Sequence, residues 1–149
     1  MTTPSPRLVE FNQNLHAMGL RNTPQRTAVL EYLDSTDTHP SAAEVYSALK
    51  QRYPGLSFAT VYNTLDLLVG MGYISVLGDI GDNQAHFDSN IVPHANLVCV
   101  RCHSITDIHS PHLENLGTFI TQESGFEVVN SRILYYGLCP VCQQETKNT

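Results

Sequence analysis

The sequence has no apolar run long enough to cross a membrane, although 42% of its 149 residues are hydrophobic. A transmembrane helix needs about 20 consecutive apolar residues. The first residues, MTTPSP, also lack the apolar segment of a secretory signal. We therefore expect a globular, cytoplasmic protein with no membrane partner.

Basic side chains are scarce. Eight lysines and arginines face fourteen aspartates and glutamates, which gives a net charge of −6. Taken alone, this charge argues against a nonspecific nucleic-acid binder. Residues 1–80 hold five basic and seven acidic side chains, whereas residues 81–149 hold three and seven. Any phosphate contacts are therefore expected in the less acidic N-terminal half.

Cysteine is also rare, and its few copies are paired. The only four are Cys99 and Cys102, then Cys139 and Cys142, so each pair has the spacing C-x2-C. Two such knuckles complete a tetrahedral all-sulfur shell, which suits zinc. Because 36 residues separate the pairs, the ion would hold a whole folded subdomain together.

Two other interpretations of the cysteines are possible. A pair of disulfides would need an oxidising compartment, to which no signal peptide points. A thioredoxin-like redox site would need only one C-x-x-C, near a βαβ unit. Matched pairs that use all the sulfur favour structural zinc.

The first half of the chain predicts a winged helix-turn-helix. Helices are expected over residues 7–18, from Pro24 after an N-cap at Thr23, from Ser41 to about residue 52, and from Ser57 to about residue 70. A hairpin over residues 73–77 and 84–88 follows. In this order, the third and fourth helices supply the turn and the reading helix, and the hairpin is the wing.

The second half predicts a small α/β domain. A hinge is expected at residues 89–93, strands at 95–100 and 105–108, a helix at 111–124, strand material from 126 to 138, and a frayed polar tail from 143. The fold class is therefore α+β. Its predicted parts are a winged-helix DNA-binding domain at 1–88, the hinge, and an α/β metal-binding domain at 94–149.

Several stretches together resemble the Fur (ferric uptake regulator) family of metal-responsive repressors. They are residues 19–26 (GLRNTPQR), 39–44 (HPSAAE) and 57–63 (SFATVYN), with the two cysteine knuckles. The resemblance covers nearly the whole chain. It implies a homodimer joined through the C-terminal domain, zinc in the four-cysteine site, and a second, regulatory metal site between the domains. Its partner is double-stranded operator DNA with two-fold symmetry.

The chain is most similar to the peroxide-sensing (PerR-type) branch of that family. There the regulatory Fe²⁺ or Mn²⁺ is held at positions that match His39, Asp88, His94 and Asp107. The iron-sensing branch more often has glutamate where Asp107 stands. It also has a further metal site, whose ligand positions hold Pro93 and Ala95 here.

The sequence departs from the family at one ligand position. A histidine is usual two residues beyond His94, whereas this chain has Asn96, whose amide oxygen is a weaker, neutral ligand. Either Asn96 binds the ion, or His86 or another nearby group enters the shell, or water completes it. His109, beside Asp107, is a candidate for orienting a ligand.

The resemblance places DNA contacts at the start of the fourth helix and near the second. Tyr62 and Thr60 lie opposite the expected buried face of Val61, Leu65 and Leu68, where a reading helix meets base edges. The candidate DNA-binding residues are Arg21, Arg26, Ser57, Ala59, Thr60, Tyr62 and Asn63.

The predicted function is a metal-dependent repressor that responds to oxidative stress. The resemblance implies that peroxide reacts at ferrous iron, that His39 or His94 gains oxygen, and that DNA is released. The alternative is a sensor of iron or zinc level on the same scaffold. A zinc hydrolase would need an open metal position and a thiol peroxidase a free cysteine, so we do not expect an enzyme.

Overall fold

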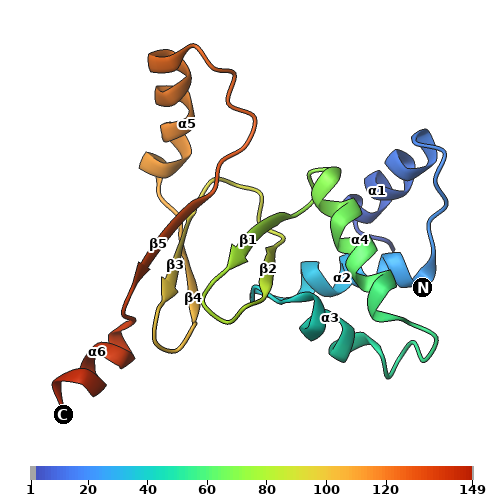
Figure 1. Ribbon diagram of the computed structural model, residues 1–149. Coiled ribbons are helices and arrows are strands. Elements are labelled where there is room, and N and C mark those ends of the chain that lie inside the picture. Colours follow the sequence, from blue (N-terminus) through green and yellow to red (C-terminus); the bar gives the residue numbers. More distant parts are fainter. Residues whose placement is uncertain (1–2, 149) are drawn as a thin grey trace. The chain divides into compact units, whose positions relative to one another are not determined.

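A computed structural model describes residues 3–148 of the chain (Figure 1). Met1, Thr2 and Thr149, which fall within the predicted terminal domains, lie outside the described residues. The packing divides the chain into two units, residues 1–76 with 87–89 and residues 77–86 with 90–149. Across residues 3–148, no helix is both long and apolar enough to cross a membrane.

The first unit is built on four helices, α1 (Pro6–Ala17), α2 (Pro24–Ser35), α3 (Ala42–Leu49) and α4 (Phe58–Gly70). Their predicted starts are confirmed. Thr23 caps α2 by accepting from the Arg26 N–H, and Ser57 caps α4 by accepting from the Thr60 N–H. Ser41 and Glu44 form the expected capping box of α3.

One apolar core holds these helices together. Its fully buried side chains come from all four helices: Phe11, Leu15, Val29, Leu30, Leu33, Val45, Val61, Leu65 and Leu68. Each such side chain contributes about 1.5–3 kcal/mol by leaving water. The predicted inward face of α4 is therefore confirmed, and the opposite face is left for solvent or a ligand.

A hairpin of β1 (Ser75–Asp79) and β2 (Ala85–Asp88) follows α4. The Asp79 carboxylate accepts from the N–H groups of Gly81 and Asn83, which closes the turn. At the other end of the hairpin, the Phe87 N–H donates to the carbonyl oxygen of Pro40 over 3.0 Å. This bond brings the end of β2 to the loop before α3.

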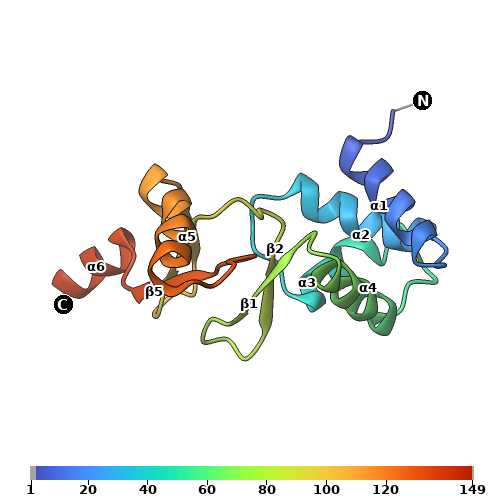
Figure 2. The ribbon, with the colours of Figure 1, turned by 90° about the horizontal axis from the view of Figure 1, so that it is seen from above.

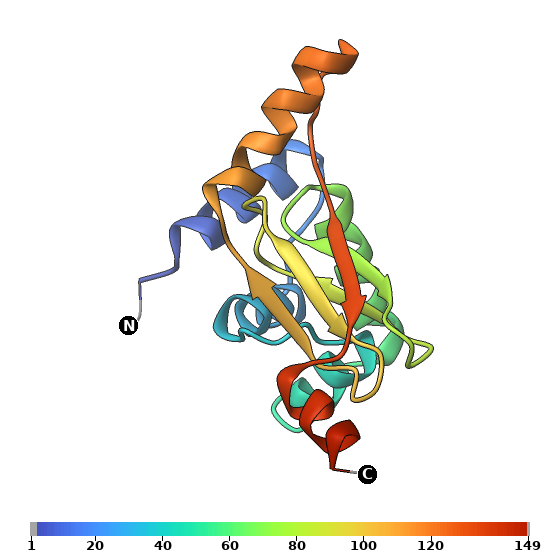
Figure 3. The same ribbon diagram turned by 90° about the vertical axis from the view of Figure 1, so that its left-hand side faces the viewer.

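The second unit contains a three-stranded sheet with β3 in its centre (Figure 3). β3 (Ala95–Cys99) runs antiparallel to β4 (Ile105–Ile108) and parallel to β5 (Ile133–Gly137). α5 (Pro111–Ser124) stands at one end of this sheet and α6 (Pro140–Lys147) at the other (Figure 1). Gly125 ends α5 with φ of 76°, the left-handed conformation that glycine adopts without strain.

Residues 77–86 group with the second unit, although the predicted DNA-binding domain extends to residue 88. The reason is packing near the turn of the hairpin, where Leu77 and Ile80 are buried. The His103 ring nitrogen Nδ1 lies 3.3 Å from the carbonyl oxygen of Ile80. The boundaries at residues 88 and 94 that the sequence predicts for the two domains stay a prediction.

Two predictions for the second unit are wrong. The tail is not frayed over residues 143–147, because α6 continues to Lys147. Cys139 caps this helix and Pro140 stands at its first position. Residues 126–129 form no strand: among the described residues no neighbouring strand pairs with them, and Phe126 and Val129 are 73% and 89% exposed.

Candidate metal centres and reading helix

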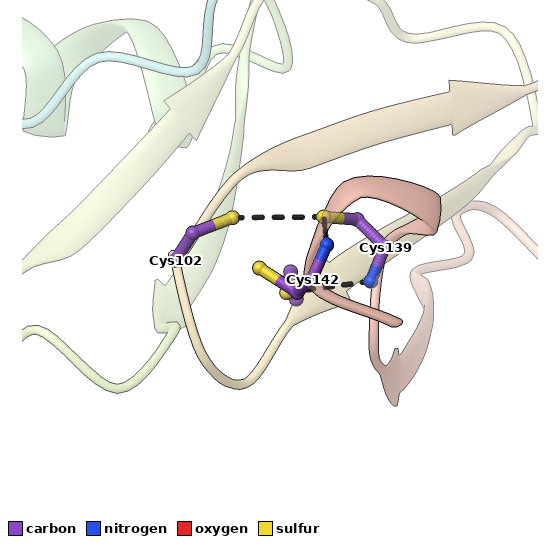
Figure 4. Close-up of side chains that lie close together, drawn as sticks. Cys102, Cys139 and Cys142 are labelled. Atoms are coloured by element: carbon purple, nitrogen blue, oxygen red, sulfur yellow. Dashed lines mark hydrogen bonds between the residues drawn. The ribbon is translucent and has the colours of Figure 1, made fainter. Parts of the chain in front are cut away.

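The sheet brings the two cysteine knuckles together. Cys99 ends β3 and Cys102 lies in the turn to β4, while the pairing of Cys99 with Gly137 on β5 delivers Cys139 to the same place. The four sulfur atoms all lie within 4.8 Å of one another. Those of Cys102 and Cys139 face each other 3.8 Å apart (Figure 4).

These distances fit zinc. A zinc–sulfur bond of about 2.3 Å in a tetrahedron places the sulfur atoms about 3.8 Å apart. Backbone N–H groups support the sulfurs, since Cys139 donates to the Cys99 sulfur and Cys142 to the Cys139 sulfur, each over 3.4 Å. Four sulfurs close the coordination shell, so no position is left for a substrate.

The electrostatics of the cluster also call for a cation. Hydrogen bonds from the backbone N–H groups of Cys102 and Cys139 lower the pKa of Cys99 to about 6. Burial raises the pKa of Cys142 to about 12. Four thiolates this close repel one another, so without an ion only some can be ionised. A bound divalent metal removes this conflict by deprotonating its thiol ligands.

Arg101 ties the first knuckle to α6. Its guanidinium donates to the Thr146 hydroxyl over 3.0 Å and to the Cys142 carbonyl over 3.4 Å. Glu145 lies 3.8 Å from the same guanidinium. The residue between two cysteine ligands thus positions the helix that carries the fourth, a role that spacing alone did not reveal.

The first unit contains a buried histidine–aspartate pair. His39 Nε2 lies 3.5 Å from the Asp88 carboxylate, and both side chains are almost fully buried. The bond between Phe87 and Pro40 explains the pairing, because His39 and Asp88 are the residues that flank it. Two predicted regulatory ligands are therefore brought together within this unit.

The second unit contains another histidine–aspartate pair, in which His94 is buried and Asp107 is partly buried. His94 Nε2 lies 3.7 Å from the Asp107 carboxylate, and His94 Nδ1 lies 2.6 Å from the carbonyl oxygen of Val92. Because a carbonyl only accepts, Nδ1 carries the hydrogen and a neutral ring presents a bare Nε2, the form that binds metal. The His109 ring stacks on His94 at 5.1 Å, so His109 contacts a candidate ligand directly.

Asn96 is the third predicted ligand in the second unit. It stands opposite Asp107 in the register of β3 and β4 and is 2% exposed. Its side-chain oxygen is buried without a hydrogen-bond partner among the described residues. A buried acceptor without a partner is costly, so a cation at this end of the strand would satisfy it. The alternative ligand His86 instead lies 2.7 Å from Asp82, which is also in the second unit.

The comparisons with known proteins identify the family. The sequence profile of the ferric uptake regulator family matches residues 17–136. The chain belongs to this family.

Relatives and solved structures of the Fur family extend the likeness. The peroxide-responsive repressor PerR of Staphylococcus epidermidis is 36% identical over 138 residues, which cover 93% of this chain and 91% of that protein. A structure of PerR from Streptococcus pyogenes, described in terms of peroxide sensing and gene regulation, is 31% identical with a TM-score of 0.51; the match covers 90% of this chain and 91% of that one. The ferric uptake regulator of Pseudomonas aeruginosa, solved with manganese, is 28% identical with a TM-score of 0.73, and the match covers 87% and 97%.

Fur-family proteins are metal-responsive transcription regulators, and they bind DNA as dimers. α3 and α4 follow each other in the order expected of a helix-turn-helix and pack together. The second helix of such a motif contacts base edges with its N-terminal residues. Ser57, Ala59, Tyr62 and Asn63 are exposed at this end, and Thr60 is partly buried. The hydroxyl groups of Ser57 and Thr60 lie 2.8 Å apart.

Of the two arginines predicted to meet DNA, Arg21 is exposed and Arg26 is partly buried. Arg26 donates to the carbonyl oxygen of Arg21 over 2.6 Å, so it also fixes the loop before α2. Phe58, the first residue of α4, is 48% exposed and was not among the predicted DNA contacts.

Proposed function

We propose that this protein is a peroxide-responsive repressor that acts in the cytoplasm as a homodimer. It binds a two-fold symmetric operator when its regulatory site holds Fe²⁺ or Mn²⁺, and it releases the operator after peroxide has reacted at the iron form. The observation that carries the proposal is the ligand chemistry. The chain has an all-sulfur cluster and, apart from it, two histidine–aspartate pairs that offer nitrogen and oxygen donors.

The two kinds of site suit two roles. Zinc in the four-cysteine cluster is closed and structural. Imidazole and carboxylate ligands suit iron and manganese, and an open position leaves the metal available to a small oxidant. The 36% identity with a peroxide-responsive repressor over nearly the whole chain supports this division.

In the proposed regulatory site, one ion is shared by His39 and Asp88 with His94, Asp107 and Asn96. The first two belong to one packing unit and the other three to the other. An ion held by all of them fixes the angle between the DNA-binding and C-terminal domains. Because metal binds tightly only to the closed form, occupancy shifts the dimer toward the shape that fits DNA.

Asn96 completes this shell in our proposal. Its orphaned buried oxygen supports the choice, since a cation would give that atom the partner it lacks. The amide is neutral, like the imidazole that is usual at this position, but its oxygen is a weaker ligand for a divalent ion, so we expect weaker binding of the regulatory metal.

Ferrous iron held by these residues would supply the chemistry that splits the O–O bond of peroxide. One oxygen atom would enter a ring C–H bond of His39 or His94, which are the nearest oxidisable groups, and the other would leave as water. A damaged ring binds metal poorly, so the site opens and the domains lose their fixed angle. The two reading helices then lose the spacing that a two-fold operator requires.

The proposed DNA contacts divide by chemistry. Arg21 and Arg26 meet phosphate, whereas Ser57, Ala59, Thr60, Tyr62 and Asn63 at the start of α4 meet base edges.

The second copy is expected to cover the apolar face of α5, where Leu116, Phe119 and Ile120 are 40–55% exposed. No residue of α5 is buried within the single described chain.

The decisive experiment is operator binding with Mn²⁺, Fe²⁺ and Zn²⁺, each with and without peroxide, followed by mass spectrometry of the peptides. We expect peroxide to abolish binding of the Fe²⁺ form and to add one oxygen atom to the peptide with His39 or His94. The Mn²⁺ form should stay bound and unmodified, and the cysteines should stay reduced. Intact histidines with oxidised cysteines would indicate a thiol sensor. DNA binding that only follows free iron or zinc would establish the metal-level sensor instead.

A further inference from the structure

A row of three aromatic rings leads from the core of the first unit to the exposed start of α4. Tyr46 on α3 is partly buried and packs against the apolar core. Its ring meets the Phe58 ring edge-on, with centroids 6.0 Å apart. Phe58 in turn stacks on Tyr62, one helical turn further on, with centroids 6.5 Å apart and planes at 29°. α3 and α4 pack against each other (Figure 2), which holds the row in place.

The outer two rings are exposed to solvent, although burying aromatic rings would be favourable. Phe58 and Tyr62 are 48% and 47% exposed, and they form one contiguous apolar surface at the N-terminal end of the reading helix. Exposed apolar patches of this kind mark interaction sites. The first turn of α4 contains no acidic residue that would repel DNA, and Lys50 lies over the Tyr46 ring at 5.8 Å, so the patch is bordered by a cation.

The first unit has few charges with which to hold DNA. It carries five basic side chains, and Arg7 is bound to Asp34 at 2.5 Å. At most four remain for phosphate, which limits the log–log salt slope to about 3.6 for each subunit, at about 0.9 per contact. Discrimination between sequences therefore depends strongly on the base edges that α4 meets.

We propose that Phe58, held between Tyr46 and Tyr62, reads thymine 5-methyl groups in the major groove. This inference rests on the proposed DNA-binding function. The thymine methyl is the apolar group that base pairs present in the major groove, and aromatic side chains contact it. Because neighbouring rings fix Phe58 on two sides, little side-chain freedom is lost when DNA binds. Phe58 thus determines specificity, and the operator is expected to carry thymine under the start of each reading helix.

The test uses duplexes selected from a random pool by the full-length, zinc-loaded protein with Mn²⁺. In the best-bound duplex, each thymine is replaced singly by deoxyuridine, which removes only the methyl group. We expect a loss of roughly fourfold in affinity at one or two thymines in each half-site, the worth of one buried methyl-sized group. Replacing symmetric thymines in both half-sites should cost about fifteenfold.

The variant Phe58→Ala should bind the thymine and deoxyuridine duplexes equally at those positions. Phe58→Leu, which keeps an apolar body without the stacked ring, should retain part of the difference. Val9→Ala, a truncation of a residue 40% exposed on α1, should leave the difference unchanged. Zinc content and circular dichroism confirm that each variant is folded.

Two results would overturn the inference while leaving the proposed function intact. In one, the wild type binds its operator but is insensitive to methyl removal at every thymine. In the other, Phe58→Ala keeps the full sensitivity of the wild type. Failure to select any duplex would instead refute the proposed function, and this inference with it.

Discussion

Removing one zinc ligand should unfold the second unit and leave the first unit folded. The perturbation is Cys139→Ser, which deletes the sulfur that lies 3.8 Å from Cys102 and caps α6. Structural zinc contributes about 10–16 kcal/mol to the folding of zinc-finger peptides. Whole domains are stable by about 5–15 kcal/mol, so the loss is as large as the stability that a domain has.

The second unit has little else to replace the metal. The contiguous apolar core consists of residues of the first unit. In the second unit, the buried apolar side chains are few and mostly small: Leu77, Ile80, Ala95, Val98, Cys99 and Cys142. Two of these six are zinc ligands, which become unpaired thiols when the metal leaves.

The assay combines zinc content with amide hydrogen exchange read by peptide. Cys139→Ser should hold no zinc, and peptides that cover β3 and β5 should lose protection while those from α2 and α4 keep it. The matched control is Leu33→Ala in the core of the first unit, since truncating a buried leucine to alanine lowers the free energy of unfolding by about 2–5 kcal/mol. It should lower protection in the helices and leave zinc bound. A zinc-free Cys139→Ser protein with native protection of β3 and β5 would refute the reasoning.

Three pairs of variants test the remaining assignments. His94→Ala should abolish Mn²⁺-dependent operator binding without changing the zinc content. Asn96→Ala should weaken Mn²⁺ binding by about tenfold or more. If calorimetry gives Asn96→Ala the same Mn²⁺ affinity as the wild type, Asn96 is not a ligand. Arg21→Ala should flatten the log–log salt slope of DNA binding by about 0.9, whereas Tyr62→Ala should reduce discrimination between DNA sequences without changing the slope. If the two variants behave alike in DNA-binding titrations at several salt concentrations, the assignment of α4 is wrong. Gly81→Ala should destabilise the second unit more than Gly78→Ala does. Both glycines have positive φ, so each substitution strains the backbone by about 1–3 kcal/mol. Only at Gly81 would the new methyl group also meet the His103 ring, at 2.9 Å. Equal melting temperatures of the two variants would rule out this clash.

Local signals in the sequence predicted most of the secondary structure. Thr23, Ser41 and Ser57 are polar caps directly before apolar periodic segments, and the structure uses all three as predicted. The sequence also predicts both ends of α5, because Pro111 stands at its first position and Gly125 follows its last turn. Such signals depend on a few neighbouring residues, which is why they need no knowledge of the tertiary fold.

The missed features depend on distant contacts. α6 has no apolar stripe, and its stability comes from the Cys139 cap and from Arg101, which is some 40 residues away in the chain. The capping signal Cys139-Pro140 was present, but the polar composition of the segment concealed it. Phe58 was missed for a related reason: an apolar residue at a helix start is usually buried, and only its contacts with Tyr46 and Tyr62 show an exposed, supported ring.

The proposed homodimer would explain two features of the second unit together, namely the unpaired segment at residues 126–129 and the exposed face of α5. Among residues 3–148, the stretch FEVV, which is rich in β-forming residues, has no strand beside it. The helix α5, which has an apolar stripe, buries none of its side chains. Both lie in the second unit, and we propose that the protein is a homodimer. In a two-fold dimer the same surface of each copy meets its counterpart, so the partner's second unit is the element that can cover both features. In the proposed homodimer, zinc and the partner would stabilise the same unit. Its unfolding should depend on protein concentration as well as on zinc. The unfolding of the first unit, which has its own core, should depend on neither protein concentration nor zinc.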